Sequence, residues 1–277
     1  MQPERTTPTG TATRPVTRYE RGQATQDDDR LAEEVPVAIH FDGAPFAVMM
    51  ASPVDLEDFA RGFALTEGKV GDVRDIAGIE VNEVLEGITV DVAIAPGAAL
   101  PARVDTGPPA TRELPGRSGC GICGTRELED VIRRPRPVAA GPTVAPDAIE
   151  RALEALRAEQ PINAFTGSVH AAAWARADGS LMVVREDVGR HNALDKLIGA
   201  MTRRGIDPRE GFAVITSRAS YEMVTKAAVA GITIVVAISA PTALAVHLAA
   251  DCGVTLAGFA RPGRFNLYSR PERIQAL

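Results

Sequence analysis

Two cysteines, Cys120 and Cys123, are the residues of this chain best suited to chemistry. They lie in the segment Ser-Gly-Cys-Gly-Ile-Cys-Gly at positions 118–124. Three glycines in this segment leave the backbone free to move and let a large partner approach the sulfur atoms. A helix is expected directly behind it, at 126–134, and a helix N-terminus with arginines close by favours the thiolate form of a cysteine. We therefore interpret Cys120 as a nucleophilic or sulfur-carrying residue.

Three other chemistries of a Cys-x-x-Cys pair fit this chain less well. A structural zinc ion needs four ligands, and the pair supplies two; the third cysteine, Cys252, lies in an apolar helical stripe and is expected to be buried. The zinc deaminase signature requires His-x-Glu before Pro-Cys-x-x-Cys, but Gly119 precedes Cys120 and no histidine is followed two residues later by glutamate. A thioredoxin-like pair would follow a strand of a βαβ unit, whereas this pair follows a Pro- and Gly-rich segment. We expect no zinc ion.

Length and composition limit the function classes. The 277 residues can form one large or two modest domains. A formal net charge of −6 argues against a broad nucleic-acid surface, which needs a basic face. No apolar run approaches the roughly 18–20 residues that a membrane span requires, and the N-terminus lacks the pattern of a signal peptide. We expect a cytoplasmic protein without nucleic-acid or membrane partners.

The first half of the chain predicts a small α+β unit behind a disordered tail. Residues 1–32 are rich in Thr, Pro, Arg and Asp and contain few apolar side chains, which is typical of disorder. Apolar runs separated by turn signals then predict four strands, at 35–41, 46–50, 79–84 and 87–95. After the second strand, Ser52 can cap a helix whose apolar stripe ends at Gly68. This unit is assigned to residues 33–115.

The second half alternates between strands and helices, which predicts a three-layer α/β domain with a largely parallel sheet. The expected strands are 169–175, 181–184, 212–216, 232–238 and 254–256. The expected helices begin at 146, lie around 193–201, and span 220–230 and 241–250. This domain is assigned to residues 146–277, so the fold is α+β overall. Residues 116–145 are assigned to the cysteine loop, a short helix and a linker.

Three strand ends in this second domain carry polar residues and lead into helices. Open α/β sheets bind ligands beyond the carboxyl ends of their strands, and helix N-termini suit phosphate groups. The candidate binding residues at these ends are Asp187, Arg190, His191, Ser217, Arg218, Ser220, Ser239 and Thr242. The alternative is that the hydroxyls are ordinary helix caps. Asp187 is either a salt-bridge partner of an arginine or a ligand contact, and His191 is either a general acid–base group or a cap residue.

A fourth polar segment directly follows the last expected strand. It contains Phe259, Ala260, Arg261, Pro262, Gly263 and Arg264. Gly263 lets the backbone approach a ligand closely, and the arginines on each side of it are bidentate donors for phosphate. Phe259 and Phe265 are candidates for stacking on a base. The alternative interpretation is a surface loop with solvated arginines.

Five segments in this order along the chain match one known family. They are Gly-Phe-Ala-Leu-Thr-Glu-Gly at 62–68, the cysteine segment at 118–124, Asp-Val-Gly-Arg-His-Asn-Ala-Leu-Asp-Lys at 187–196, Ser-Arg-Ala-Ser-Tyr-Glu-Met-Val-Thr-Lys at 217–226 and Ser-Ala-Pro-Thr-Ala-Leu-Ala-Val at 239–246. Together they resemble the formate dehydrogenase accessory proteins, the FdhD sulfurtransferase family. The resemblance runs from about residue 35 to residue 268 and leaves out the N-terminal tail. A Cys-x-x-Cys pair alone is a weak signal, whereas five ordered segments are specific.

The resemblance implies a sulfurtransferase that carries sulfur as a persulfide on Cys120. Such proteins take sulfur from a cysteine desulfurase and pass it to the molybdenum cofactor, a bis(molybdopterin guanine dinucleotide), before that cofactor enters formate dehydrogenase. The family's cofactor-binding segment corresponds to residues 259–264, and GDP is expected to mimic the nucleotide end of the cofactor. The resemblance also implies a cytidine deaminase-like fold without zinc for the second domain, and a homodimer.

Two roles stay open for Cys123: it releases sulfur by forming a disulfide with Cys120, or it only tunes the loop. The alternative function is a non-catalytic chaperone that holds the molybdenum cofactor and performs no sulfur chemistry. A zinc nucleoside deaminase is a further rival, which metal analysis would decide.

Overall fold

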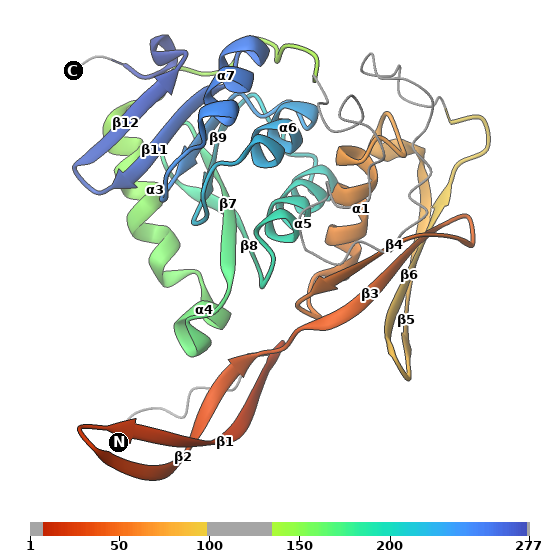
Figure 1. Ribbon diagram of the computed structural model, residues 1–277. Coiled ribbons are helices and arrows are strands. Elements are labelled where there is room, and N and C mark those ends of the chain that lie inside the picture. Colours follow the sequence, from red (N-terminus) through yellow and green to blue (C-terminus); the bar gives the residue numbers. More distant parts are fainter. Residues whose placement is uncertain (1–7, 99–134, 276–277) are drawn as a thin grey trace.

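Two β-sheets form the body of the structure, and two helices packed against each other lie between them (Figure 1). The computed structural model describes residues 8–98 and 135–275. The two helices are α1, Leu56–Thr66, from the first half of the chain and α5, Arg190–Arg203, from the second. The contact between α1 and α5 therefore joins the two halves.

The larger sheet has six strands in the order β12-β11-β10-β9-β7-β8. Their bounds are β7 His170–Arg176, β8 Leu181–Asp187, β9 Gly211–Ile215, β10 Ile234–Ala237, β11 Thr255–Arg261 and β12 Arg264–Ser269. The β9–β10 and β10–β11 pairs are parallel, whereas β7–β8, β7–β9 and β11–β12 are antiparallel. The prediction of a largely parallel sheet is therefore wrong. The reason is that β7–β8 and β11–β12 are hairpins, and a tight turn joins only antiparallel strands.

Helices cover both faces of the larger sheet, which confirms the three predicted layers. On one face lies α3, Pro146–Ala158; on the other lie α5, α6 (Tyr221–Val229) and α7 (Ala243–Cys252). Ala173 of β7 packs with α3, while Trp174 packs with the α5–α7 layer, because successive side chains of a strand point to opposite faces. A short helix that the sequence analysis did not predict, α4 (Pro161–Thr166), follows α3. Among the described helices, none is long and apolar enough to cross a membrane.

The smaller sheet has four strands in the order β4-β3-β6-β5, and α1 covers one of its faces. The bounds of its strands are β3 Val35–Phe41, β4 Ala44–Ala51, β5 Ile76–Val84 and β6 Gly87–Ile94. Short 3-10 helices also occur: η1 (Val73–Asp75) precedes β5, and η2 (Pro271–Arg273) follows β12. These strands and the apolar stripe of α1 confirm the prediction. The predicted helix cap is wrong, because α1 begins at Leu56 and Asp55 occupies its N-cap position. Ser52 is instead fully buried against the second half of the chain.

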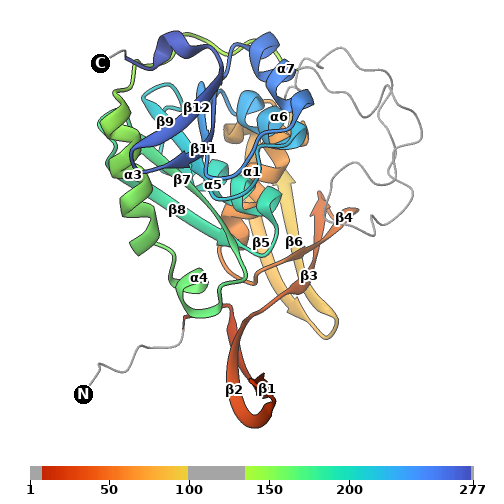
Figure 2. The same cartoon turned by 60° about the vertical axis from the view of Figure 1, so that its left-hand side comes forward.

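Residues 11–32 form a long hairpin, which corrects the expectation of a mostly disordered tail. β1, Thr11–Glu20, and β2, Gln23–Ala32, pair antiparallel over their whole length. Arg21 and Gly22 form the turn with positive φ angles, the conformation that type I′ hairpin turns require. Figure 2 shows the hairpin projecting from the body of the molecule. Its side chains are all at least partly exposed. The strands are therefore held by backbone hydrogen bonds and lack the alternation of apolar and polar residues from which strands are predicted in a sequence.

Two glycines bring α1 and α5 into backbone contact. A β-carbon on Gly62 would overlap the carbonyl oxygen of Asp195, and a β-carbon on Gly199 would overlap that of Asp58. Both overlaps are with backbone atoms, which cannot rotate away. The spacing of the two helices therefore depends on the absence of side chains at these positions.

We expect Gly199→Ala to destabilise the fold, because the helices must separate to accept the added methyl group. Overpacking of this kind typically costs about 1–3 kcal/mol. Urea unfolding followed by circular dichroism measures the free energy of unfolding. Gly78→Ala on β5 is the matched control, since nothing lies within 4 Å of a β-carbon there. Equal stability of the two variants would contradict the tight helix contact.

Candidate functional site

Three of the predicted polar segments lie side by side at one edge of the larger sheet. The Ala219 amide donates to the carbonyl of Ala240 over 3.2 Å, and the Phe259 amide donates to the carbonyl of Ser239 over 3.1 Å. These bonds join the segments that follow β9 and β10 to the end of β11. The carboxyl ends of β9 and β10 therefore lie at one edge, together with the end of β11. We name this surface, from residues 217–220, 239–242 and 259–261, the strand-end edge.

A buried contact between a histidine and a carboxylate ties the N-terminus of α5 to that of α6 beside this edge. His191 Nε2 lies 2.8 Å from Glu222 Oε2, and His191 is only 4% exposed. Burial raises the pKa of Glu222, but the hydrogen bond and the charge of His191 oppose this, and the net pKa is lowered. Glu222 is therefore ionised at neutral pH. His191 therefore links α5 to α6. The sequence analysis considered it as a general acid–base group or a cap residue and did not predict this link.

Two polar atoms at the same helix N-termini have no hydrogen-bond partner among the described residues. They are Arg190 Nε, at the first residue of α5, and Ser220 Oγ, at the N-cap of α6. Buried polar atoms without partners cost free energy, and each one calls for an explanation such as a ligand or an ordered water. Arg218 between them in the chain is exposed. Together these groups present donors where a phosphate group would be received.

Two of the predicted hydroxyl ligands are engaged within the protein. Thr242 caps α7 by accepting a hydrogen bond from the Ala245 amide, so the helix-cap alternative holds for it. The Ser217 hydroxyl donates to the carbonyl of Arg218 over 3.1 Å and is 4% exposed. Ser239 is half-buried and contributes its carbonyl to the bond with Phe259.

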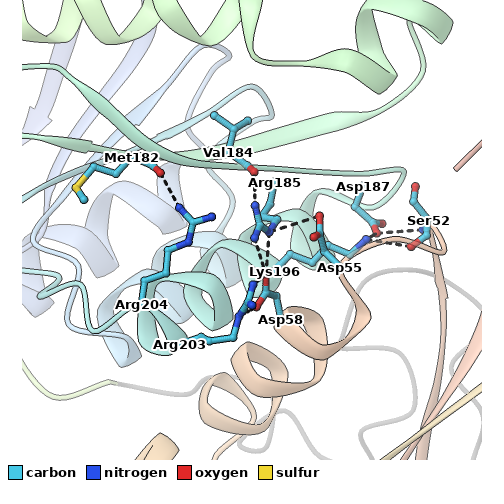
Figure 3. Close-up of polar contacts among 10 residues, drawn as sticks. All are labelled: Ser52, Asp55, Asp58, Met182, Val184, Arg185, Asp187, Lys196, Arg203 and Arg204. Carbon is cyan, nitrogen blue, oxygen red and sulfur yellow. Dashed lines mark hydrogen bonds and ion pairs between the residues drawn. The ribbon is translucent and has the colours of Figure 1, made fainter. Parts of the chain in front are cut away.

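Asp187 is a structural residue at the joint between the two halves (Figure 3). Its side chain is fully buried, and its Oδ2 lies 2.6 Å from Lys196 Nζ and accepts the Ser52 amide over 3.0 Å. Its Oδ1 accepts the Gly189 amide and the Asn192 side chain. The predicted salt bridge exists, but to a lysine. With both oxygens engaged inside the protein, we leave Asp187 out of the ligand site.

The segment predicted as a polar loop is the β11–β12 hairpin. Phe259 has φ 53° at a bulge in β11 and is 49% exposed. A bulky residue in the left-handed region is strained, and such strain gathers at functional sites. Arg261 donates to the carbonyls of Ile238 and Ala260, whereas Arg264 is exposed. The hairpin thus presents an aromatic ring and a cation at the strand-end edge; Pro262 and Gly263 form its exposed turn.

A cavity of about 540 Å³ lies elsewhere, beside β8 and α4. Its two arginines already have partners: Arg185 contacts Asp58 at 2.7 Å, and Arg204 donates to the carbonyl of Met182 over 2.9 Å (Figure 3). We place the candidate site at the strand-end edge because a strained aromatic residue lies there, beside polar atoms that have no partner within residues 8–98 and 135–275.

The three cysteines fall into two groups. Cys120 and Cys123 lie outside the described residues, so their roles stay predictions. Cys252 is buried in α7, as expected from the sequence, and burial together with Asp251 raises the pKa of its thiol to about 11. A thiol with so high a pKa is a poor nucleophile at neutral pH.

Comparison with known proteins decides the family. The model of the FdhD/NarQ family matches residues 32–275. The chain belongs to the FdhD/NarQ family. The resemblance indicated by the five ordered segments is thereby confirmed, and the match covers both sheets and the joint between them.

Individual relatives agree over nearly the whole chain. The sulfur carrier protein FdhD of Xanthomonas campestris pv. campestris is 50% identical over 275 residues, which are 99% of this chain and 95% of that protein. The sulfur carrier protein FdhD of Cupriavidus necator is 48% identical over 260 residues, 94% of this chain and 88% of that protein. A crystal structure described as that of a formate dehydrogenase accessory protein from Desulfotalea psychrophila superposes with a TM-score of 0.75 at 25% identity, covering 96% of this chain and 99% of that one.

Sequence reasoning missed two residues beside the strand-end edge, His170 and Glu222. His170 is the first residue of β7, and Glu222 lies in the first turn of α6. A histidine at a strand end and a glutamate in a first helical turn are both ordinary in sequence. Only their approach to α5 makes them part of the site.

We expect Lys196→Met to destabilise the protein strongly, because it leaves the Asp187 carboxylate buried without its cation. Breaking a buried ion pair by removing one partner costs about 3–5 kcal/mol. The control is Arg209→Met, which removes an exposed pair with Asp207 and should cost no more than about 1 kcal/mol. Urea unfolding of both variants measures the two losses, and equal losses would contradict the structural role of the joint.

Proposed function

We propose that this protein is a sulfur carrier that serves formate dehydrogenase. The observation that carries the proposal is 50% identity over 99% of the chain to a protein named sulfur carrier protein FdhD. A second support is the cysteine segment at 118–124, whose glycines, together with the helix that the sequence predicts after it, suit a reactive thiolate. Within this proposal the protein acts in the cytoplasm as a homodimer.

The sulfur chemistry is assigned to Cys120. Its thiolate attacks the outer sulfur of a persulfide on a cysteine desulfurase; the S–S bond of the donor breaks and the donor cysteine leaves as a thiolate. The product is a persulfide on Cys120. If Cys123 then attacks the Sγ of Cys120, the outer sulfur leaves as hydrosulfide and a disulfide remains. In the other open role, Cys123 only tunes the loop.

The acceptor in this proposal is the molybdenum cofactor, a bis(molybdopterin guanine dinucleotide), which is cargo and not a resident group. The strand-end edge suits its nucleotide end. Phosphate groups fit the donors at the α5 and α6 N-termini, where Arg190 Nε and Ser220 Oγ have no partner among the described residues. Phe259 is half-exposed and suits stacking on the guanine ring. The cytidine deaminase-like relationship of the second domain belongs to the same proposal.

Mass spectrometry tests the sulfur assignment. After incubation with a cysteine desulfurase and cysteine, we expect the peptide that contains Cys120 to gain the mass of about one sulfur atom, since a thiolate accepts sulfane sulfur. Cys252 is the internal control, because its raised pKa and burial disfavour reaction. Cys120→Ala should also lose activation of formate dehydrogenase.

Variants of the two cysteines give the results that would change these assignments. Full activation by Cys120→Ala would contradict the persulfide assignment and favour the non-catalytic chaperone. If Cys123→Ala carries sulfur on Cys120 but does not deliver it, Cys123 releases the sulfur; if delivery is unchanged, Cys123 has no direct part.

Calorimetric titration with GDP tests the nucleotide site. We expect Arg218→Ala and Arg264→Ala each to weaken GDP binding by roughly 10- to 100-fold, because hydrogen bonds to charged groups contribute about 1.5–3 kcal/mol. Arg209→Ala, which removes an exposed arginine paired with Asp207, is the matched control. Unchanged affinity in both variants would remove the strand-end edge as the nucleotide site.

A further inference from the structure

His170 lies on the sheet beneath the N-termini of α5 and α6. It is the first residue of β7 and pairs across the strands with Asp187, the last residue of β8. Ala172 and Trp174 of the same strand pack with the α5–α7 layer, and side chains two apart share a face. The imidazole of His170 therefore points to the helix side of the sheet, where Arg190 and His191 begin α5.

Among the neighbours of His170 on α5 and β8, the guanidinium of Arg190 carries a positive charge. Arg190 and His191, at the start of α5, are near enough to influence the pKa of His170, and Asp187 pairs with it across the strands from β8. Asp187 is already paired with Lys196 at 2.6 Å, and Glu222 of α6 is paired with His191 at 2.8 Å. Both carboxylates are thus engaged, while Arg190 Nε has no hydrogen-bond partner among the described residues. An anion would balance the charge of the Arg190 guanidinium.

The protonation state of His170 follows from the same neighbours. Burial lowers the pKa of His170, and the electrostatic effects of Arg190 and His191 lower it further, against a smaller opposing effect of Asp187. The imidazole is therefore neutral at neutral pH while the site is empty. A phosphate group held by Arg190 would reverse the balance, because a nearby opposite charge favours the charged form of a histidine.

We propose that His170 is a proton-linked phosphate ligand: when a nucleotide phosphate binds at the α5 N-terminus, His170 takes one proton from the solvent and donates a charged hydrogen bond to it. The inference rests on the proposed nucleotide site. The only bond formed is the N–H bond of the imidazolium. By linkage, binding is tightest at low pH and weakens as the pH rises through the pKa that His170 has in the complex.

Histidine-selective NMR tests this proposal on the wild-type protein. The chain has four histidines, so the ring signals of ¹³C-labelled histidine are few and are assigned with single His→Gln variants. We expect saturating GDP to raise the titration midpoint of His170 by about one pH unit. His247, which is exposed on α7, should keep its midpoint, and guanosine, which lacks phosphate, should not shift His170.

The outcomes separate this inference from the nucleotide site itself. If GDP binds and the His170 midpoint stays in place, or only His191 shifts, the inference is overturned while the site stands. If GDP does not bind the wild-type protein, the nucleotide site fails first and the inference with it. As a second measurement, GDP affinity should fall less between pH 6 and 8 in His170→Gln than in wild type, whereas equal pH profiles overturn the proposal.

Discussion

The close contact between α1 and α5 is the constraint on which the rest of the structure depends. Gly62 and Gly199 bring the two backbones together, and buried charged side chains complete the joint between the two halves. Lys196 reaches the carbonyl of Ser52 as well as Asp187. Lys226 reaches Asp195 and also the hydroxyl of Thr66 in α1. A buried charge is stable only with its partners in place, so the two halves meet in one register.

This joint extends to the candidate site through Asp187. The carboxylate that binds Lys196 also accepts the Gly189 amide and the Asn192 side chain, which surround the first residues of α5. Asn192 in turn donates to the carbonyl of Met50 in the smaller sheet. The orientation of Arg190 and His191 at the strand-end edge is therefore set partly by residues of the first half of the chain.

The strand-end edge departs from the rest of the fold in the way that binding sites do. Most of the core is well satisfied, yet here an exposed phenylalanine adopts a left-handed backbone, and two buried polar atoms have no partner in the part of the chain that the structure describes. Strain and missing partners cost free energy, and they persist where a ligand compensates for them. The sulfur chemistry has a different basis: it depends on a cysteine motif and on relatives named as sulfur carriers.

The family, the positions of nearly all helices and strands in the two sheets, and the strand ends at the candidate site could be predicted from the sequence. These features are local: periodic apolar side chains, turn residues and ordered motifs lie within short stretches of chain. The roles of Ser52 and Asp187, which are 135 residues apart, became known from the folded structure, as did the approach of His170 and Glu222 to α5. The folded structure also shows that residues 11–32 pair as a hairpin and that the larger sheet is mixed. Hydrogen bonds and buried charges between distant segments leave no periodic signal in the chain, so their partners are known only when the halves are packed together.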